Sequence, residues 1–400
     1  MIADIWDTHG RSATRRIVRL ARQELTPAQT IIWTAVVVVI VLFPVLVSSS
    51  RFLDVAITYG IFAICLYGLG FLYGQTNYLS IAHSALLGVG AYTAAILFIQ
   101  AGLGFWAVLP LAALLAMAAA LLLGYPALRV SGYHFVIVTF AACELFVLAT
   151  RNLGGAEARK GLTGGAQGLD VTEPVGQIFG QSFDINLELA PFYYLVIAFL
   201  FVTLIVTQIL VLSPLGRTFR AIRENEPLAR SVGIRANWYK ILAFGISGLF
   251  AGVAGALFSY KLGHIAPDLF NSFEGVELAL MVLLGGSRRL MGPLVGAIIV
   301  GFLPEILDVI GIGLTPFQRQ IVFGAMLIAV IILLPHGLVQ GVADLYGLAK
   351  RSLAAYLRPP PGPADGEGSE VDPPEPADDE AAEADEADEA EQEAERVGGS

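Results

Sequence analysis

Cysteines, metal-ligand clusters and catalytic motifs are scarce in this 400-residue sequence. Only two cysteines occur, Cys65 and Cys143, and both lie inside apolar stretches, so no disulfide framework is expected. None of the five histidines stands near another histidine or a cysteine at metal-ligand spacing, so we expect no metal site. The run GGAEARKG at residues 154–161 lacks the serine or threonine that follows the lysine of a phosphate-binding loop, and no nucleophile elbow occurs. We therefore expect no enzyme activity and no cofactor in this chain.

Charged residues are also few, and they are unevenly placed. They make up 14% of the chain, against 56% hydrophobic residues and a mean hydropathy of +0.70, which is typical of a polytopic membrane protein. The net charge of −10 comes from the C-terminal end, because residues 361–400 hold 16 acidic residues and one basic residue. The acidity therefore carries no information about nucleic acid, and we expect no nucleic-acid partner.

Ten apolar segments are long enough, or nearly so, to cross a bilayer as helices. The sequence predicts an all-α polytopic membrane protein of about ten transmembrane helices, with the membrane domain at residues 31–338. The eighth segment is short for a full crossing and is expected to be tilted or re-entrant. The predicted spans are residues 31–47, 52–73, 74–97, 105–123, 133–150, 192–212, 241–262, 276–284, 294–310 and 321–334.

Basic residues give the orientation. With ten crossings, most basic loops fall on one side of the membrane, which is the cytoplasmic side by the positive-inside rule. Both termini are then cytoplasmic. Residues 1–30 form a basic N-terminal segment, and residues 339–400 form an acidic tail expected to be disordered. The tail is an interaction segment, an adaptation to a salty cytoplasm, or a solvated end without essential function.

The polar loop at residues 213–240 has six basic residues against two acidic ones. Ser213 and Pro214 suit a helix cap and first turn, Pro227 suits the start of a second helix, and Gly233 suits a C-terminal cap. The sequence thus predicts two short helices on the cytoplasmic face.

Both short helices are predicted to be amphipathic. Phe219 with Ile222, and Leu228 with Val232, stand at helical spacing. Such a loop is either an ordinary basic loop at the lipid headgroups or a docking surface for a soluble partner.

Two features inside the predicted spans bear on function. Residues 74–97 begin polar and then become rich in small residues, and a broken helix of this kind can face a ligand or a water-filled cavity. Glu144 lies inside an apolar segment, where an acid is unfavourable unless it faces a cavity or a partner. It lies near the outer interface, accepts hydrogen bonds within the bundle, or lines a translocation pathway.

Glycines recur where helices are expected to pack closely. The external loop at residues 151–190 is also glycine-rich, at residues 161–169, and is either flexible or a docking site for a binding protein. The predicted helix-packing glycines are Gly88, Gly90, Gly248, Gly252, Gly292 and Gly296.

The loop at residues 213–240 resembles the coupling loop of ABC importer permeases, specifically the second, longer permease of the branched-chain amino acid family. It matches the pattern S-P-x-G-R-x-x-R-A-I-R-E-N-E without a gap. Four more stretches resemble family motifs in the same order, at residues 79–92, 161–169, 285–297 and 334–338.

The chain departs from the family pattern at a few positions. Asn77 and Ala82 stand where the family usually has glycine, which leaves the local backbone open. Arg288 and Arg289 replace a Gly-Thr pair, so no role transfers to them.

The resemblance implies a multi-pass permease subunit of the plasma membrane. Its expected partners are two ATPase subunits, which use the ATP, a second related permease, an external substrate-binding protein and the lipid bilayer. Coupling to the ATPase is assigned to Arg217, Arg220, Arg223, Glu224, Glu226 and Gly233.

The expected substrates are leucine, isoleucine and valine, with urea, short amides or simple sugars as alternatives. A small zwitterion needs polar groups in the membrane, and the candidates are Ser80, His83, Tyr92, Thr139 and Glu144. An ion-coupled secondary carrier and a purely structural membrane subunit are the competing classes.

Overall fold

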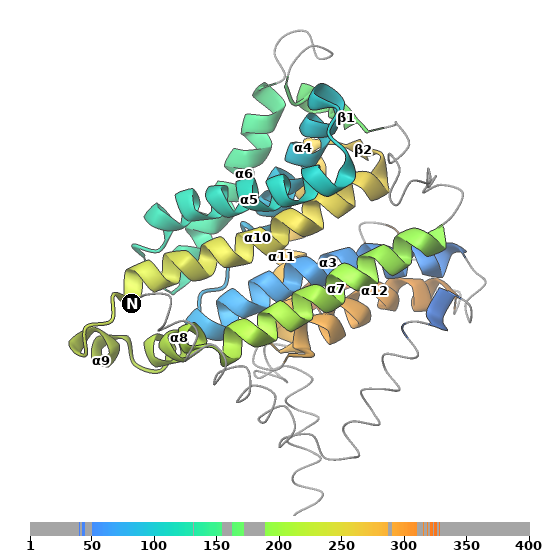
Figure 1. The fold of residues 1–400 in the computed structure, drawn as a ribbon. Helices are drawn as coiled ribbons and strands as arrows, with labels where there is room; N and C mark the ends of the chain where they lie inside the picture. Colours follow the sequence, from blue (N-terminus) through green and yellow to red (C-terminus); the bar gives the residue numbers. More distant parts are fainter. Residues whose placement is uncertain are drawn as a thin grey trace, which may run out of the picture. The chain divides into compact units, whose positions relative to one another are not determined.

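The computed structural model describes most of the predicted membrane domain (Figure 1). Described are residues 50–130, 132–153, 162–171, 189–286 and 290–309, with isolated positions at 40–44 and 315–328. The chain divides into two units, residues 1–347 and 348–400, and every described residue belongs to the first. The predicted N-terminal segment and acidic tail lie outside the described residues, as do most of the first and last predicted spans.

The described residues are almost entirely helical, and the only strands among them have two residues each. The longer helices are α3 (Ser50–Thr76), α4 (His83–Ala101), α5 (Phe105–Ala127), α6 (Tyr133–Asn152), α7 (Leu189–Leu212), α10 (Ala236–Leu262), α11 (Ser272–Gly285) and α12 (Gly292–Val309). The short elements are α8 (Pro214–Glu224), α9 (Glu226–Ser231), the 3-10 turns η1 (Gly165–Gln167) and η2 (Pro267–Phe270), and strands β1 (Leu169–Asp170) and β2 (His264–Ile265).

Helices α3 and α10 form the centre of the bundle. Helix α10 packs against α3, α4 and α5, and α3 also packs against α7 and α12 (Figure 1). In their most apolar windows, 72% of the α3 residues and 78% of the α10 residues are buried. The buried core therefore follows these two helices.

Lipid is as apolar as the side chains, so the hydrophobic effect does not drive helices together in a membrane. Close packing, which small residues permit, takes its place. A Cβ on Gly90 of α4 would lie 2.5 Å from the carbonyl oxygen of Gly252 in α10. A Cβ on Gly255 would lie 2.0 Å from the carbonyl oxygen of Leu87. The backbones of α4 and α10 thus touch where only glycine fits.

Helices α6 and α7 lie at the edge of the bundle and remain apolar on their outer faces. Only 28% of the most apolar window of each is buried, and Ile137, Leu145 and Ile205 are more than half exposed. An apolar surface of this kind is suited to lipid or to another membrane subunit. Six described helices are long and apolar enough to cross a membrane, namely α3, α4, α5, α6, α7 and α10.

The fold class predicted from sequence, an all-α polytopic membrane protein, is confirmed, and the count of ten crossings stays a prediction. Helix α11 has 14 residues, about 21 Å at 1.5 Å per residue, which is shorter than the hydrocarbon core. The eighth segment is thus short in the structure too.

The third predicted crossing, at residues 74–97, begins differently from the prediction. Residues 74–76 belong to the last turn of α3, and a non-helical break at residues 77–82 precedes α4. Asn77 opens this break with φ of 62°, in the left-handed region that favours glycine and tolerates asparagine. Ala82 has ordinary torsion angles, φ −65° and ψ 0°. Asn77 therefore adopts the left-handed conformation at a position where the family that the sequence resembles usually has glycine.

Candidate coupling surface and substrate path

Helix α8 is capped at its start and buries a phenylalanine against the bundle. The Ser213 hydroxyl accepts a hydrogen bond from the Gly216 amide, and Pro214 occupies the first turn, as the sequence predicts. Phe219 is fully buried, with its ring edge-on to Phe71 of α3. The inner face of α8 thus packs against α3.

Helix α9 follows after one residue, Asn225, whose side chain accepts a hydrogen bond from the Leu228 amide. The helix begins at Glu226, one residue before the predicted start at Pro227. Its chain turns away at Gly233, with φ of 87°.

The inner and outer faces of α9 differ sharply in burial. Ala229 is buried beside Ile222 and Ala236. Leu228 is 62% exposed and Val232 is 71% exposed, so the predicted apolar pair lies on the outer surface. An exposed apolar pair beside charged residues is suited to contact with another protein.

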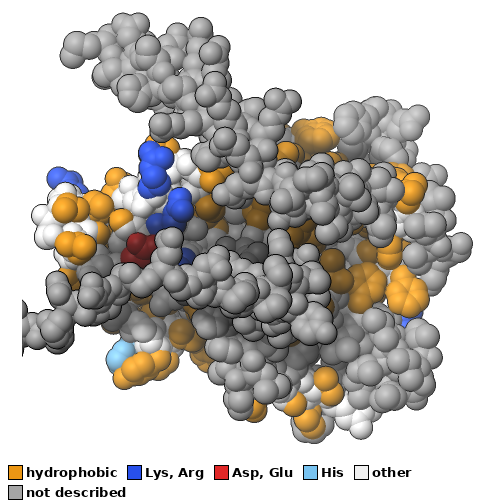
Figure 2. Space-filling view, turned by 90° about the horizontal axis from the view of Figure 1, so that it is seen from below, with side chains coloured by type: hydrophobic (Ala, Val, Ile, Leu, Met, Phe, Trp, Pro, Cys, Tyr) orange, Lys and Arg blue, Asp and Glu red, His pale blue; other side chains and the backbone are white. Residues whose placement is uncertain are grey.

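The charged side chains of α8 lie in two settings. Arg217, Arg220 and Glu224 are exposed. Arg223 is half-buried, and its guanidinium donates a hydrogen bond to the carbonyl oxygen of Gly74 in the last turn of α3. Figure 2 shows most of the visible Lys and Arg side chains gathered, with an acidic side chain, toward the end where Figure 1 places α8 and α9.

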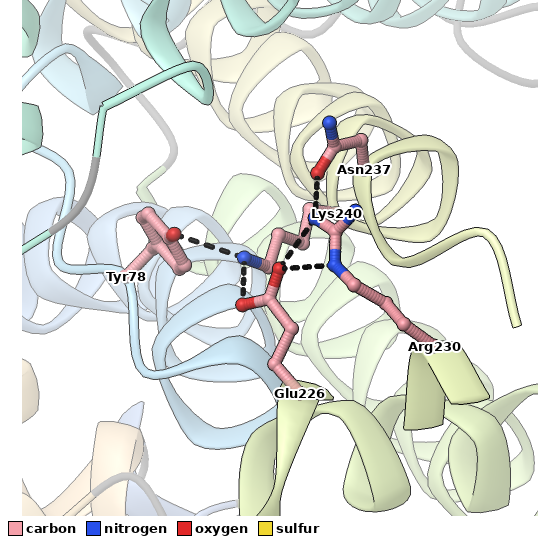
Figure 3. Close-up of polar contacts among 5 residues, drawn as sticks. All are labelled: Tyr78, Glu226, Arg230, Asn237 and Lys240. Carbon is pink, nitrogen blue, oxygen red and sulfur yellow. Dashed lines mark hydrogen bonds and ion pairs between the residues drawn. The ribbon is translucent and has the colours of Figure 1, made fainter. Parts of the chain in front are cut away.

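Glu226 is directed into the protein rather than away from it (Figure 3). Its Oε2 lies 2.5 Å from Nζ of Lys240, whose side chain is only 4% exposed. Its Oε1 accepts hydrogen bonds from Arg230, at 2.8 Å from Nη2. Lys240 also donates to the Tyr78 hydroxyl at 2.9 Å, and Arg230 donates to Oδ1 of Asn237 at 2.6 Å.

This network keeps Glu226 ionised. Burial opposes ionisation, but hydrogen bonds and charges from Lys240 and Arg230 outweigh it, so the pKa of the Glu226 carboxyl lies below its ordinary value. The contacts of Lys240 with Glu226 and Tyr78 were not predicted from the sequence. The available signal was a lysine close to the start of an apolar helix, because a buried charge needs a partner.

The predicted substrate-path residues lie around the break before α4. Ser80 and His83 are fully buried, and the His83 ring lies edge-on to Phe244 of α10. Thr139 of α6 accepts a hydrogen bond from the Ile81 amide at 3.2 Å. The Tyr92 hydroxyl lies further along α4 and, like the Ser80 hydroxyl, has no hydrogen-bond partner among the described residues.

Glu144 belongs to α6, and its carboxylate lies beside the start of the short helix α11. Its Oε1 accepts a hydrogen bond from the Ser272 amide at 3.3 Å, and the residue is otherwise exposed. Nearby, the Ser84 hydroxyl donates to the Asn271 carbonyl oxygen at 3.0 Å, and the Cys143 thiol donates to that of Phe270 at 3.2 Å. The beginnings of α4 and α11 and the middle of α6 therefore meet at one place.

The described part of the glycine-rich loop is anchored. The Thr163 hydroxyl donates to the Thr150 carbonyl oxygen at 2.7 Å, and β1 pairs antiparallel with β2. His264 Nδ1 lies 2.6 Å from a carboxylate oxygen of Asp170. Of the two alternatives for this loop, free flexibility is disfavoured at residues 162–171.

The predicted packing glycines all lie at close approaches. A Cβ on any of them would come within 3 Å of another heavy atom. The nearest atoms belong to Phe146 for Gly88, Gly252 for Gly90, Ala120 for Gly248, Ala116 for Gly252, Gly286 for Gly292 and Met281 for Gly296.

Arg288, Arg289 and the motif at residues 334–338 lie outside the described residues. The described residues contain no group of three potential metal ligands.

The apolar helices and their exposed outer faces define a multi-pass membrane protein. Between two of its spans lie two capped short helices with a charged outer surface. The chain belongs to the family described as the permease component of branched-chain amino acid transport systems, which matches residues 48–331. No solved structure matches it.

Named relatives agree with the family. The chain is 31% identical over 294 residues to the high-affinity branched-chain amino acid transport system permease protein LivM of Escherichia coli K12, covering 69% of this chain and 68% of the relative. LivM of Salmonella typhimurium LT2 matches equally over the same share. The ribose import permease RbsC of Bacillus subtilis is 28% identical over 162 residues, covering 39% of this chain and 48% of the relative.

Proposed function

We propose that this chain is a permease subunit of an ABC importer in the plasma membrane, and that a separate ATPase pair drives it through α8 and α9. The observation that carries this proposal is the two-faced geometry of these helices. Their inner faces are fixed by Phe219 and Ala229, whereas Arg220, Glu224 and Leu228 are presented outward. Such a surface combines charge with apolar contact, as protein interfaces do.

The connections of the two helices support a mechanical role. Helix α8 follows α7 after Ser213 alone, and residues 232–235 join α9 to α10. Because α10 is central to the bundle, a force applied by an ATPase to α8 and α9 would reach α4 and α5 through it. The substrate path would then switch between outward and inward access. Both termini of the chain would lie in the cytoplasm.

We assign branched-chain amino acids as the substrates. The LivM matches extend over more than two thirds of each chain, whereas the ribose permease matches cover less than half of either. The path would pass Ser80, His83, Tyr92, Thr139 and Glu144. An external binding protein would deliver the substrate, and a second related permease would complete the membrane part.

The test is charge reversal on the outer surface alone. The variant R217E/R220E/E224K changes three exposed side chains, of which Arg220 makes a long hydrogen bond, 3.5 Å, to the carbonyl oxygen of Val211. It spares Arg223 and Glu226, whose internal contacts are shorter. We expect loss of ATPase co-purification and of ATP-driven leucine uptake in liposomes. Arg129→Glu, an exposed position after α5, is the control and should leave both unchanged. Unimpaired assembly and uptake in the triple variant would refute the proposal, and uptake without any ATPase would indicate a secondary carrier.

A further inference from the structure

Lys240 connects three elements through one ion pair and one hydrogen bond. Glu226 belongs to α9, Lys240 is near the start of α10, and Tyr78 lies in the break between α3 and α4 (Figure 3). Lys240 contacts both of the others, since its Nζ donates to the Glu226 carboxylate and to the Tyr78 hydroxyl. A displacement of α9 therefore acts directly on Lys240 and, through it, on the break.

The burial of Lys240 makes this connection stiff. A buried ammonium group without a partner is strongly unfavourable, so the Lys240 side chain has to follow the carboxylate of Glu226. The pair of Arg230 with Glu226 is different, because it is an exposed i,i+4 contact that ordinarily contributes little. The same carboxylate thus makes one strong internal contact and one weak surface contact.

The far end of the connection reaches the predicted substrate path. The Tyr78 ring lies edge-on to Phe135 of α6, with centroids 5.0 Å apart. Two residues beyond Tyr78 comes the fully buried Ser80, and the Ile81 amide is bonded to Thr139. Movement of Tyr78 would therefore change the backbone that carries Ser80 and its contact with α6.

We propose that Glu226, Lys240 and Tyr78 are positioning residues that transmit the displacement of α9 to the substrate path. The assignment rests on the proposed function, and it gives Glu226 an inward role instead of a contact with the ATPase. Loss of the link should leave the ATPase bound and hydrolysing ATP while less substrate moves per ATP.

The experiment compares variants in the full complex reconstituted in liposomes, with labelled leucine as the probe. Tyr78→Phe removes one hydroxyl and keeps the ring. E226Q/K240M removes both charges, so no unpaired buried charge remains to prevent folding. We expect both to keep ATPase co-purification. E226Q/K240M should lower leucine uptake per ATP hydrolysed about tenfold. Tyr78→Phe should lower it less, because the Lys240 ammonium still lies over the ring, 4.7 Å from its centroid. Arg230→Met, in the same network but exposed, is the control and should change this ratio less than about twofold.

The outcomes separate this inference from the proposed function. Suppose that the wild-type complex takes up leucine and that uptake per ATP hydrolysed is unchanged in Y78F and E226Q/K240M. This result would overturn the inference and leave the proposed function standing. The inference would also be overturned if these variants lowered the amount of folded complex but left the uptake per ATP hydrolysed unchanged. The residues would then have only a structural role. Failure of the wild-type chain to recruit an ATPase would overturn the proposed function, and the inference with it.

Discussion

The Arg223 guanidinium donates a hydrogen bond to the backbone oxygen of Gly74, so α8 is attached to the end of α3 as well as to α7. The last carbonyl groups of a helix have no partner within it, and a cationic side chain is a favourable donor to them. This contact makes Arg223 part of the scaffold that presents the neighbouring arginines outward.

Replacing Arg223 should therefore affect stability before it affects docking. Arg223→Gln is expected to destabilise the purified protein by about 1.5–3 kcal/mol, the usual effect of losing a charged hydrogen bond. Thermal unfolding in detergent measures this. Arg217→Gln, at an exposed position, should stay within about 0.5 kcal/mol of wild type. Equal stability of the two variants would contradict the scaffold role.

The exposed apolar pair of α9 gives a second prediction. L228S/V232S should weaken ATPase binding without lowering the melting temperature, because both side chains are exposed in the isolated chain. Ile222→Ala, at a buried position, should instead lower stability by about 2–4 kcal/mol. Binding assays and thermal melts on the same preparations distinguish the two effects. Undiminished ATPase binding by L228S/V232S would remove the pair from the interface.

Asn77 tests the geometry of the break before α4. Asn77→Gly should be neutral or slightly stabilising, because glycine adopts φ of 62° without strain. Asn77→Val should destabilise by about 1–2 kcal/mol, because a β-branched residue is strained in the left-handed region. Thermal melts of both variants provide the comparison, and a harmless valine would show that the break has another conformation.

Gly90 tests the contact between α4 and α10. Gly90→Ala places a Cβ 2.5 Å from the Gly252 carbonyl oxygen, so the helices must separate, at about 1–3 kcal/mol. Gly104→Ala is the matched control, because no atom lies within 4 Å of its added Cβ. Folded yield and melting temperature should fall for Gly90→Ala far more than for the control, and equal behaviour would contradict the close packing.

Glu144 tests the substrate path. Glu144→Gln keeps an oxygen that can accept from the Ser272 amide but loses the charge. If the carboxylate contacts the ammonium group of the substrate, leucine uptake should fall at least about tenfold while complex assembly is unchanged. Normal uptake would mean that Glu144 only caps α11.

Local signals in the sequence predicted the helices well. Apolar runs and the cap and turn residues beside them predicted α6 and the N-cap of α8 at Ser213, because both depend on neighbours in the chain. Pairing between distant segments had no such signal. The Glu144–Ser272 and Glu226–Lys240 contacts, like the β1–β2 pairing, join residues on different elements, and periodicity within one element carries no information about which elements meet.

The burial of the short helices α8 and α9 likewise could not be predicted fully from local sequence. The spacing of Phe219 with Ile222 and of Leu228 with Val232 predicted two apolar faces. Only the first is covered by the bundle. Which face is buried depends on α3 and α10, and the loop sequence alone carries no information about them.

The proposed coupling through α8 is tested most directly by ATP-driven leucine uptake by the reconstituted complex with and without R217E/R220E/E224K. We expect uptake to require the ATPase subunits and ATP, and to be lost in the triple variant together with ATPase binding. Uptake by this chain alone, unchanged by the three reversals, would contradict the proposed coupling.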